Sequence, residues 1–156
     1  MAKVRNLEKD AAINETDAAG TPALRKRAAP GAETTITGSC LCGAVKFTVE
    51  GEPIRTGLCH CHDCRRTSGS AFAMFSIWDR SAFACTGPTR TYEGRSFCPA
   101  CGSRVFSLRP GEVEIMTGAL DRAPTDITPG YEIWTKRREH WLRPLRSAEQ
   151  FEEDRG

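Results

Sequence analysis

Seven of the eight cysteines fall into three short clusters, and this spacing constrains the fold more than any other feature of the chain. The clusters are Cys40-Leu41-Cys42-Gly43, Cys59-His60-Cys61-His62-Asp63-Cys64 and Cys98-Pro99-Ala100-Cys101-Gly102. With Zn–S bonds of ~2.3 Å, sulfurs around a tetrahedral zinc lie about 3.8 Å apart, whereas an extended strand separates residues i and i+2 by about 6–7 Å. We therefore expect a backbone turn at each cluster, eased by Gly43 and Gly102.

The number of thiols in each cluster predicts two zinc sites of different kinds. Two pairs supply four thiolates, which completes a structural site, while the middle cluster supplies three, the usual number of protein ligands at a catalytic zinc. The predicted structural ligands are Cys40, Cys42, Cys98 and Cys101, and the predicted catalytic ligands are Cys59, Cys61 and Cys64. The sequence thus predicts two zinc ions per chain.

Two alternatives remain open at this point. A disulfide framework would need an oxidising compartment, but residues 1–19 are charged throughout and lack the apolar core of a secretory signal. Three cysteines within six residues are also poor disulfide partners for one another. The second alternative keeps the zinc but completes the middle site with His60 or His62, which would make that site structural as well.

Composition indicates one domain and excludes some partners. The chain has 156 residues, 22 basic and 20 acidic side chains and a net charge of +2, so it lacks the excess of positive charge typical of nucleic-acid binding. No apolar run approaches the ~18 residues of a membrane span, and we expect a cytoplasmic protein. Residues 1–33 have no aromatic side chain and are predicted to be a disordered extension of a domain at 34–156.

The domain has the pattern of β structure. Val45, Phe47 and Val49 alternate with polar residues, as in a half-buried strand. Further strands are expected at 70–78, 83–86, 90–92, 104–108, 112–117 and 131–135, with a hairpin around Pro110-Gly111. Because long helical periodicity is absent, we predict a mainly β fold of two small antiparallel sheets stapled by zinc.

The cysteine motifs and the residues around them match a pattern known from one family. The motifs are Gly38-Ser39-Cys40-Leu41-Cys42-Gly43-Ala44-Val45, Cys59-His60-Cys61-His62-Asp63-Cys64-Arg65-Arg66-Thr67-Ser68-Gly69-Ser70 and Phe97-Cys98-Pro99-Ala100-Cys101-Gly102-Ser103. They resemble the glutathione-dependent formaldehyde-activating enzyme family, which shares its domain with centromere protein V. The resemblance covers roughly residues 34–156 and implies a β fold whose two zinc sites use the same division of cysteines.

The resemblance also implies an activity. It is the reversible addition of glutathione to formaldehyde, which gives S-hydroxymethylglutathione, or carbon–sulfur lyase chemistry on another thiol and aldehyde. The alternative function is a non-catalytic, zinc-stabilised module that contacts protein or nucleic acid through the basic runs 25–27 and 136–138. The chain departs from the family in its N-terminal extension, in a short segment between Tyr92 and Cys98, and in the additional Cys85.

Side chains near the middle cluster have two interpretations each. Arg65 and Arg66 are candidate ligands of the glutathione carboxylates, or they screen the anionic thiolates. His60 and His62 are candidate acid–base groups, although solvated loop histidines are the commoner outcome. Asp63 either orients an imidazole or caps a turn.

Four further side chains are expected to be structural. Trp78, Trp134 and Trp141 are predicted to pack in the core or at its edge rather than against substrate. Cys85 lies in an apolar stretch and is predicted to be a buried, inert thiol.

Overall fold

The computed structural model describes residues 34–156, and the predicted extension at 1–33 lies outside them. The strands are β1 (Thr35–Ser39), β2 (Lys46–Glu50), β3 (Arg55–Cys59), β4 (Ala73–Asp79), β5 (Phe83–Thr86), β6 (Arg90–Tyr92), β7 (Arg95–Phe97), β8 (Arg104–Arg109), β9 (Glu112–Met116), β10 (Tyr131–Ile133) and β11 (Glu149–Gln150). The helical elements are α1 (His62–Ser68) and the 3-10 turns η1 (Arg80–Ala82), η2 (Thr117–Ala119) and η3 (Thr135–Arg137). The mainly β class is confirmed.

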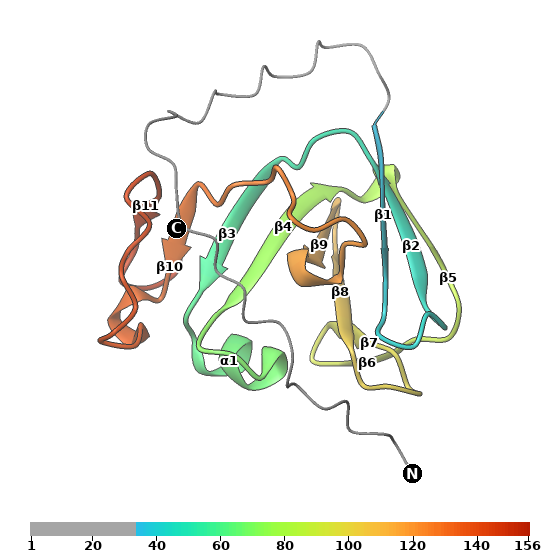
Figure 1. The fold of residues 1–156 in the computed structure, drawn as a ribbon, viewed down its shortest axis with the longest axis horizontal. Helices are drawn as coiled ribbons and strands as arrows, with labels where there is room; N and C mark the ends of the chain where they lie inside the picture. The colour runs from blue at the N-terminus through green and yellow to red at the C-terminus, as the bar shows by residue number, and fades with distance from the viewer. Residues whose placement is uncertain (1–33) are drawn as a thin grey trace, which may run out of the picture. The chain divides into compact units, whose positions relative to one another are not determined.

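The strands form two sheets of unequal size (Figure 1). The smaller has the order β1-β2-β5 and the larger has the order β11-β10-β3-β4-β9-β8-β7-β6. The pairs are antiparallel except that β10 runs parallel to both β3 and β11, which the sequence did not predict. The chain reaches β10 through a long connection after β9, which allows β10 to lie beside β3 in the parallel direction. A tight hairpin turn can join only antiparallel neighbours. Among the described residues, no helix is long and apolar enough to cross a bilayer.

The main core lies between the two sheets. The predicted alternation in β2 is confirmed, since Phe47 and Val49 are buried while Lys46 and Glu50 are exposed. Phe47 packs against Phe106 of the larger sheet, with ring centroids 6.5 Å apart. Trp78 is also buried there and donates its indole N–H to the Gly51 carbonyl at 3.0 Å, so its predicted structural role is confirmed.

The opposite face of the larger sheet carries a second, smaller cluster, formed by Cys59, Phe75, Ile77 and Tyr131. Strand alternation explains the division, because Phe75 and Ile77 of β4 point away from the face that buries Trp78. Gly57 of β3 allows this packing: a Cβ atom at this position would lie 2.5 Å from the Tyr131 ring. The pattern of residues 55–59 did not predict a strand, because this glycine interrupts it.

Cys85 is exposed, so the prediction that it is buried is wrong. Its strand, β5, is an edge strand of the smaller sheet, and only Phe83 of that strand is buried. Partial desolvation still raises the pKa of the Cys85 thiol, which agrees with the prediction of an unreactive sulfur.

A buried carboxylate joins the C-terminal segment to the larger sheet. Glu132 accepts hydrogen bonds from His60 Nε2 at 2.9 Å, Arg138 Nη1 at 3.1 Å, the Leu145 backbone N–H at 2.6 Å and Gln150 Nε2 at 3.2 Å. Although burial opposes its charge, the donors led by the Leu145 N–H hold the pKa of Glu132 below its usual value. This carboxylate therefore fixes three separate segments of the chain at one point.

We expect Glu132→Ala to lower the free energy of unfolding by about 3–5 kcal/mol, because it leaves the buried donors of its partners unpaired. Urea denaturation of the full chain measures this. Glu149→Ala, an exposed carboxylate in the neighbouring strand β11, is the matched control and should change stability by less than about 0.5 kcal/mol. Similar losses for the two variants would contradict the role of Glu132.

Candidate metal centres and the pocket above them

The paired cysteines converge into one cluster of four sulfurs. Cys40 Sγ lies 3.6 Å from Cys42 Sγ, which lies 3.7 Å from Cys98 Sγ, and all four sulfurs, including that of Cys101, are within 4.8 Å of one another. These two separations are close to the ~3.8 Å expected around a tetrahedral zinc. The four-thiol cluster therefore has the spacing that a structural zinc site needs.

Tight turns bring each pair together, as the sequence predicts. Gly43 donates its N–H to the Cys40 carbonyl at 2.9 Å, and Gly102 donates to the Cys98 carbonyl at 2.8 Å. Both glycines have positive φ, +74° and +76°, which a side chain would disfavour. The Val45 N–H also points at Cys40 Sγ from 3.2 Å and stabilises a thiolate there.

The four-thiol cluster links the two sheets. Cys40 and Cys42 follow β1 of the smaller sheet, while Cys98 and Cys101 lie between β7 and β8 of the larger one. The β7–β8 pairing shifts register between Ser96 and Phe97, directly before Cys98. Such an irregularity bends the strand and re-aims the residues that follow.

The middle cysteines form a second cluster at the end of β3. Cys59 is the last residue of β3, Cys61 is the N-cap of α1, and Cys64 lies in the first turn of that helix. The Cys64 N–H donates to Cys61 Sγ at 3.4 Å, and the three sulfurs lie within 4.8 Å of one another. Helix α1 was not predicted, because its seven residues include no buried side chain and show no periodicity.

The three-thiol cluster cannot readily carry three negative charges by itself. Hydrogen bonding from the Cys59 thiol lowers the pKa of Cys64 to about 6, and the same contact with burial raises the pKa of Cys59. The sulfurs therefore share protons, since a second thiolate at this distance is repelled by the first. A thiophilic divalent cation removes that repulsion, so the donor set fits zinc.

The two histidines of the motif have different surroundings. His60 is fully buried and bonded to Glu132, so the expectation that it is solvated is wrong; its Nδ1 has no partner among residues 34–156. His62 is exposed at the edge of the pocket. Within the described part of the chain, neither ring joins the group of metal-ligating atoms around the three sulfurs. This geometry disfavours the alternative in which a histidine completes the site.

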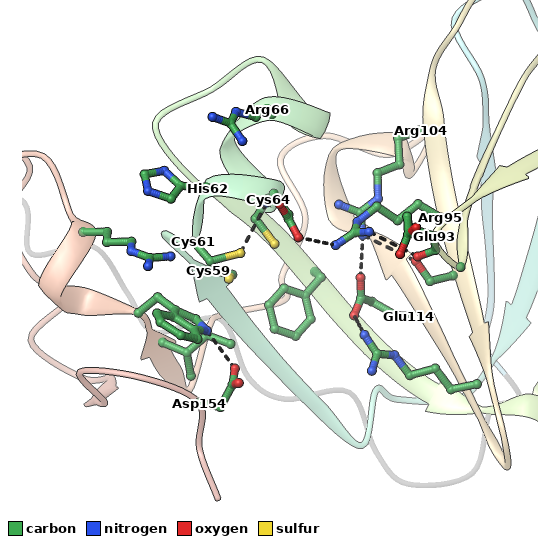
Figure 2. A pocket seen from close by; sticks show the side chains of 18 of the residues that line it. Cys59, Cys61, His62, Cys64, Arg66, Glu93, Arg95, Arg104, Glu114 and Asp154 are labelled. Atoms are coloured by element: carbon green, nitrogen blue, oxygen red, sulfur yellow. Dashed lines mark hydrogen bonds and ion pairs between the residues drawn. The ribbon is translucent and has the colours of Figure 1, made fainter.

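A cavity of about 730 Å³ opens over the three-thiol cluster (Figure 2). It lies on the face of the larger sheet opposite the main core, and Phe75 of β4 and Glu114 of β9 are among its lining residues. In Figure 2, Cys59, Cys61 and Cys64 lie near its centre, with His62 and Arg66 on the side of α1. The wall on the other side carries Glu93, Arg95 and Arg104. Cys61 and Cys64 are thus partly exposed to a ligand, while Cys59 is buried beneath them in the second, smaller cluster.

Several charges in the pocket are already neutralised by partners. Arg104 Nη2 contacts Glu114 Oε1 at 2.7 Å, and Arg109 Nη2 contacts Glu114 Oε2 at 3.4 Å. Arg95 Nη2 contacts Asp63 Oδ2 at 3.2 Å, so Asp63 orients a guanidinium and not an imidazole. Arg104 also donates to Thr67 Oγ1 at 2.9 Å and thereby fixes α1 against β8.

The two adjacent arginines of α1 differ in position. Arg66 lines the pocket and has no ion pair within residues 34–156. Arg65 does not line the pocket; it pairs with Glu139 and donates to the Arg137 carbonyl at 3.5 Å. Arg137, which the sequence analysis did not single out as a ligand, lines the pocket instead.

Trp134 forms a further wall of the pocket. Its backbone has a positive φ of +58°, and its indole N–H donates to Asp154 Oδ1 at 2.8 Å. The guanidinium of Arg137 stacks 4.7 Å from the ring centroid. Trp134 was predicted to pack in the core or at its edge; it packs against the second, smaller cluster and also lines the pocket, held by the C-terminal residues. Trp141, for which the same was predicted, is exposed, so that prediction is wrong.

Comparison with known proteins identifies one family. The model described as glutathione-dependent formaldehyde-activating enzyme matches residues 35–137, a stretch that contains both thiol clusters. A solved structure of a Rhodobacter sphaeroides protein, a structural genomics target, is 22% identical, with a TM-score of 0.44; the match covers 60% of this chain and 91% of that one. No curated protein matches the chain.

We expect two zinc ions per chain in the reduced, metal-replete protein, since the two clusters supply separate sets of sulfurs. Elemental analysis against amino-acid quantification measures the ratio. Cys59→Ser should lower it to one. A single zinc in the unaltered chain would contradict the division into two sites.

We also expect the two clusters to contribute differently to stability. Cys42 and Cys98 of the four-thiol cluster are 56 positions apart in the chain. A metal bound there would close this long loop and link the two sheets, so its binding energy would stabilise the fold. Cys98→Ser should unfold the domain or leave it insoluble, whereas Cys59→Ser should remain folded by circular dichroism. Equal losses of melting temperature would count against this account.

Proposed function

We propose that this chain, which belongs to the glutathione-dependent formaldehyde-activating enzyme family, is a zinc-dependent enzyme of carbon–sulfur chemistry. Its substrates would be glutathione or a similar thiol and formaldehyde or another small aldehyde. The observation that supports this best is the cluster of three thiols, with no fourth protein ligand among the described residues, inside a cavity that carries guanidinium groups. A purely structural zinc site is closed by four protein ligands and does not need to open into a cavity.

The proposed metal ligands follow the two clusters. Cys59, Cys61 and Cys64 would hold the catalytic zinc, and Cys40, Cys42, Cys98 and Cys101 the structural one. When bound to the three thiolates, zinc supplies a centre that lowers the pKa of a ligand thiol and keeps it as a thiolate at neutral pH. Because all of these cysteines must stay reduced, the protein fits a reducing compartment such as the cytoplasm.

The unpaired guanidinium groups would position the thiol substrate. Glutathione carries two carboxylates, and the fork of a guanidinium matches a carboxylate. Arg66 and Arg137 both line the pocket, and neither makes an ion pair with any residue from 34 to 156. Arg65 would act indirectly, because its hydrogen bond to the Arg137 carbonyl steadies the segment that carries Arg137.

The bond-making step needs a proton donor. The substrate sulfur attacks the aldehyde carbon, an S–C bond forms, and the electrons of the C=O π bond move to the oxygen. His62 lines the pocket and is open to solvent, so it would deliver the proton that the oxygen requires and remove it in the reverse reaction. Overall, the proton lost by the thiol appears on the hydroxymethyl oxygen.

The alternative of a non-catalytic binding module has less support. Most of its basic run at 136–138 is engaged in the fold, since Arg138 bonds to Glu132 and Gln150, and Lys136 pairs with Glu153. The run at 25–27 lies outside the described residues. Of these three basic side chains, only Arg137 makes no ion pair with a described residue, and a single such charge is too few to bind a nucleic acid.

We expect zinc-loaded protein to bind glutathione much more tightly than S-methylglutathione, because the thioether lacks an ionisable proton and is a weak neutral donor. Arg66→Ala and Arg137→Ala should each weaken glutathione binding by about 1–3 kcal/mol if they pair with its carboxylates. Titration calorimetry in two buffers of different ionisation enthalpy measures the affinity and the released proton together.

Arg65→Ala is the matched control, because Arg65 lies in the same helix as Arg66 but its guanidinium already pairs with Glu139. A smaller loss for this variant than for Arg66→Ala would agree with the proposed contacts. Equal affinity for the two ligands without proton release would contradict a thiolate-binding site.

A further inference from the structure

One carboxylate in the pocket is left without a partner. Glu114 pairs with two arginines, Asp63 pairs with Arg95, and Asp154 accepts the Trp134 indole N–H. The side chain of Glu93, by contrast, makes no hydrogen bond or ion pair with any residue in the described range, although its backbone carbonyl accepts from Arg95. Its negative charge is therefore available to a ligand in the same cavity.

The backbone at Glu93 is unfavourable for this residue type. Glu93 and Gly94 form the two-residue connection between β6 and β7, where Tyr92 pairs with Arg95. Both have positive φ, +49° and +74°, the geometry of a type I′ turn that favours Asn-Gly over Glu-Gly. Among the described residues, only Glu93 and Trp134 combine a side chain with a positive φ, and both line this pocket. Strain of this kind concentrates at functional sites.

We infer that Glu93 is a specificity-determining residue that receives a primary ammonium group of the thiol substrate. This inference rests on the proposed function and adds to it the recognition of the substrate's amino end. An unpaired carboxylate at the pocket wall is the natural partner of an ammonium, through charge-assisted hydrogen bonds. Arg95 next to it is already neutralised by Asp63 and therefore leaves the Glu93 charge to the ligand.

The pattern of free charges in the pocket matches a particular ligand. The charged side chains of the pocket that make neither a hydrogen bond nor an ion pair with residues 34–156 are Glu93, Arg66 and Arg137, the last stacked on Trp134. Asp154 keeps its charge, but its Oδ1 accepts the Trp134 indole N–H. One carboxylate and two guanidinium groups without a hydrogen-bond partner complement a ligand with one ammonium and two carboxylates. Glutathione has this set of charges, while a simple mercapto acid lacks the ammonium.

The test compares glutathione with glutaryl-cysteinylglycine, the same tripeptide without its amino group, by titration calorimetry on zinc-loaded full-length protein. We expect the unaltered chain to bind glutathione about tenfold more tightly. Glu93→Gln, which keeps the length of the side chain and removes its charge, should abolish that preference by weakening glutathione alone. Glu52→Gln, an exposed carboxylate outside this pocket, should keep the preference.

Stability supplies a second readout. Glu93→Asn should raise the melting temperature by roughly 2–4 °C, because asparagine suits the positive φ, and should also lose the preference for glutathione. A preference that survives Glu93→Gln would overturn the inference, as would equal binding of the two tripeptides to the unaltered chain. Binding of neither tripeptide would instead overturn the proposed function, and the inference with it.

Discussion

The close approach of sulfurs is the constraint on which the rest of the structure depends. Two clusters hold their sulfurs within 4.8 Å of one another, so each is stable as a set of thiolates only around a cation. The four-thiol cluster connects the loop after β1 to the loop before β8 and so joins the two sheets whose shared core it borders. The three-thiol cluster adds little core area but fixes the start of α1, which forms one side of the pocket.

The pocket is assembled from segments that are distant in the chain. Glu132 of β10 accepts a hydrogen bond from His60, which lies between Cys59 and Cys61 in the sequence. It also accepts hydrogen bonds from Leu145 and Gln150 of the C-terminal segment. That segment in turn supplies Asp154, which fixes the Trp134 indole at the pocket wall. Asp154 lies beyond residue 137, where the family match ends, so this wall includes a part of the chain outside the shared motifs.

The thiol clusters were predictable and the pocket walls were not, for a physical reason. A metal site imposes short local spacing and turns, and these are visible as Cys-x-Cys and Cys-x-x-Cys next to Gly43 and Gly102. His60 is buried because of a carboxylate 72 residues away, which no local pattern reveals. The places of Glu93 and Trp134 likewise depend on strand pairing and on positive φ values at residues where glycine would be expected. Parallel pairing of β10 with β3 was missed for the same reason, since it is set by tertiary contacts.

The three-thiol cluster is proposed to hold a zinc ion that can also bind the sulfur of a substrate thiol. The most direct test replaces zinc by cobalt(II) in the full chain and follows its ligand-field absorption, which reports the ligands of the metal. We expect glutathione to change the spectrum of the unaltered protein and S-methylglutathione to leave it unchanged. Cys59→Ser should abolish the response, while the spectrum of the four-thiol site persists. A spectrum already typical of four sulfurs at both metals, with no response to glutathione, would contradict this proposal.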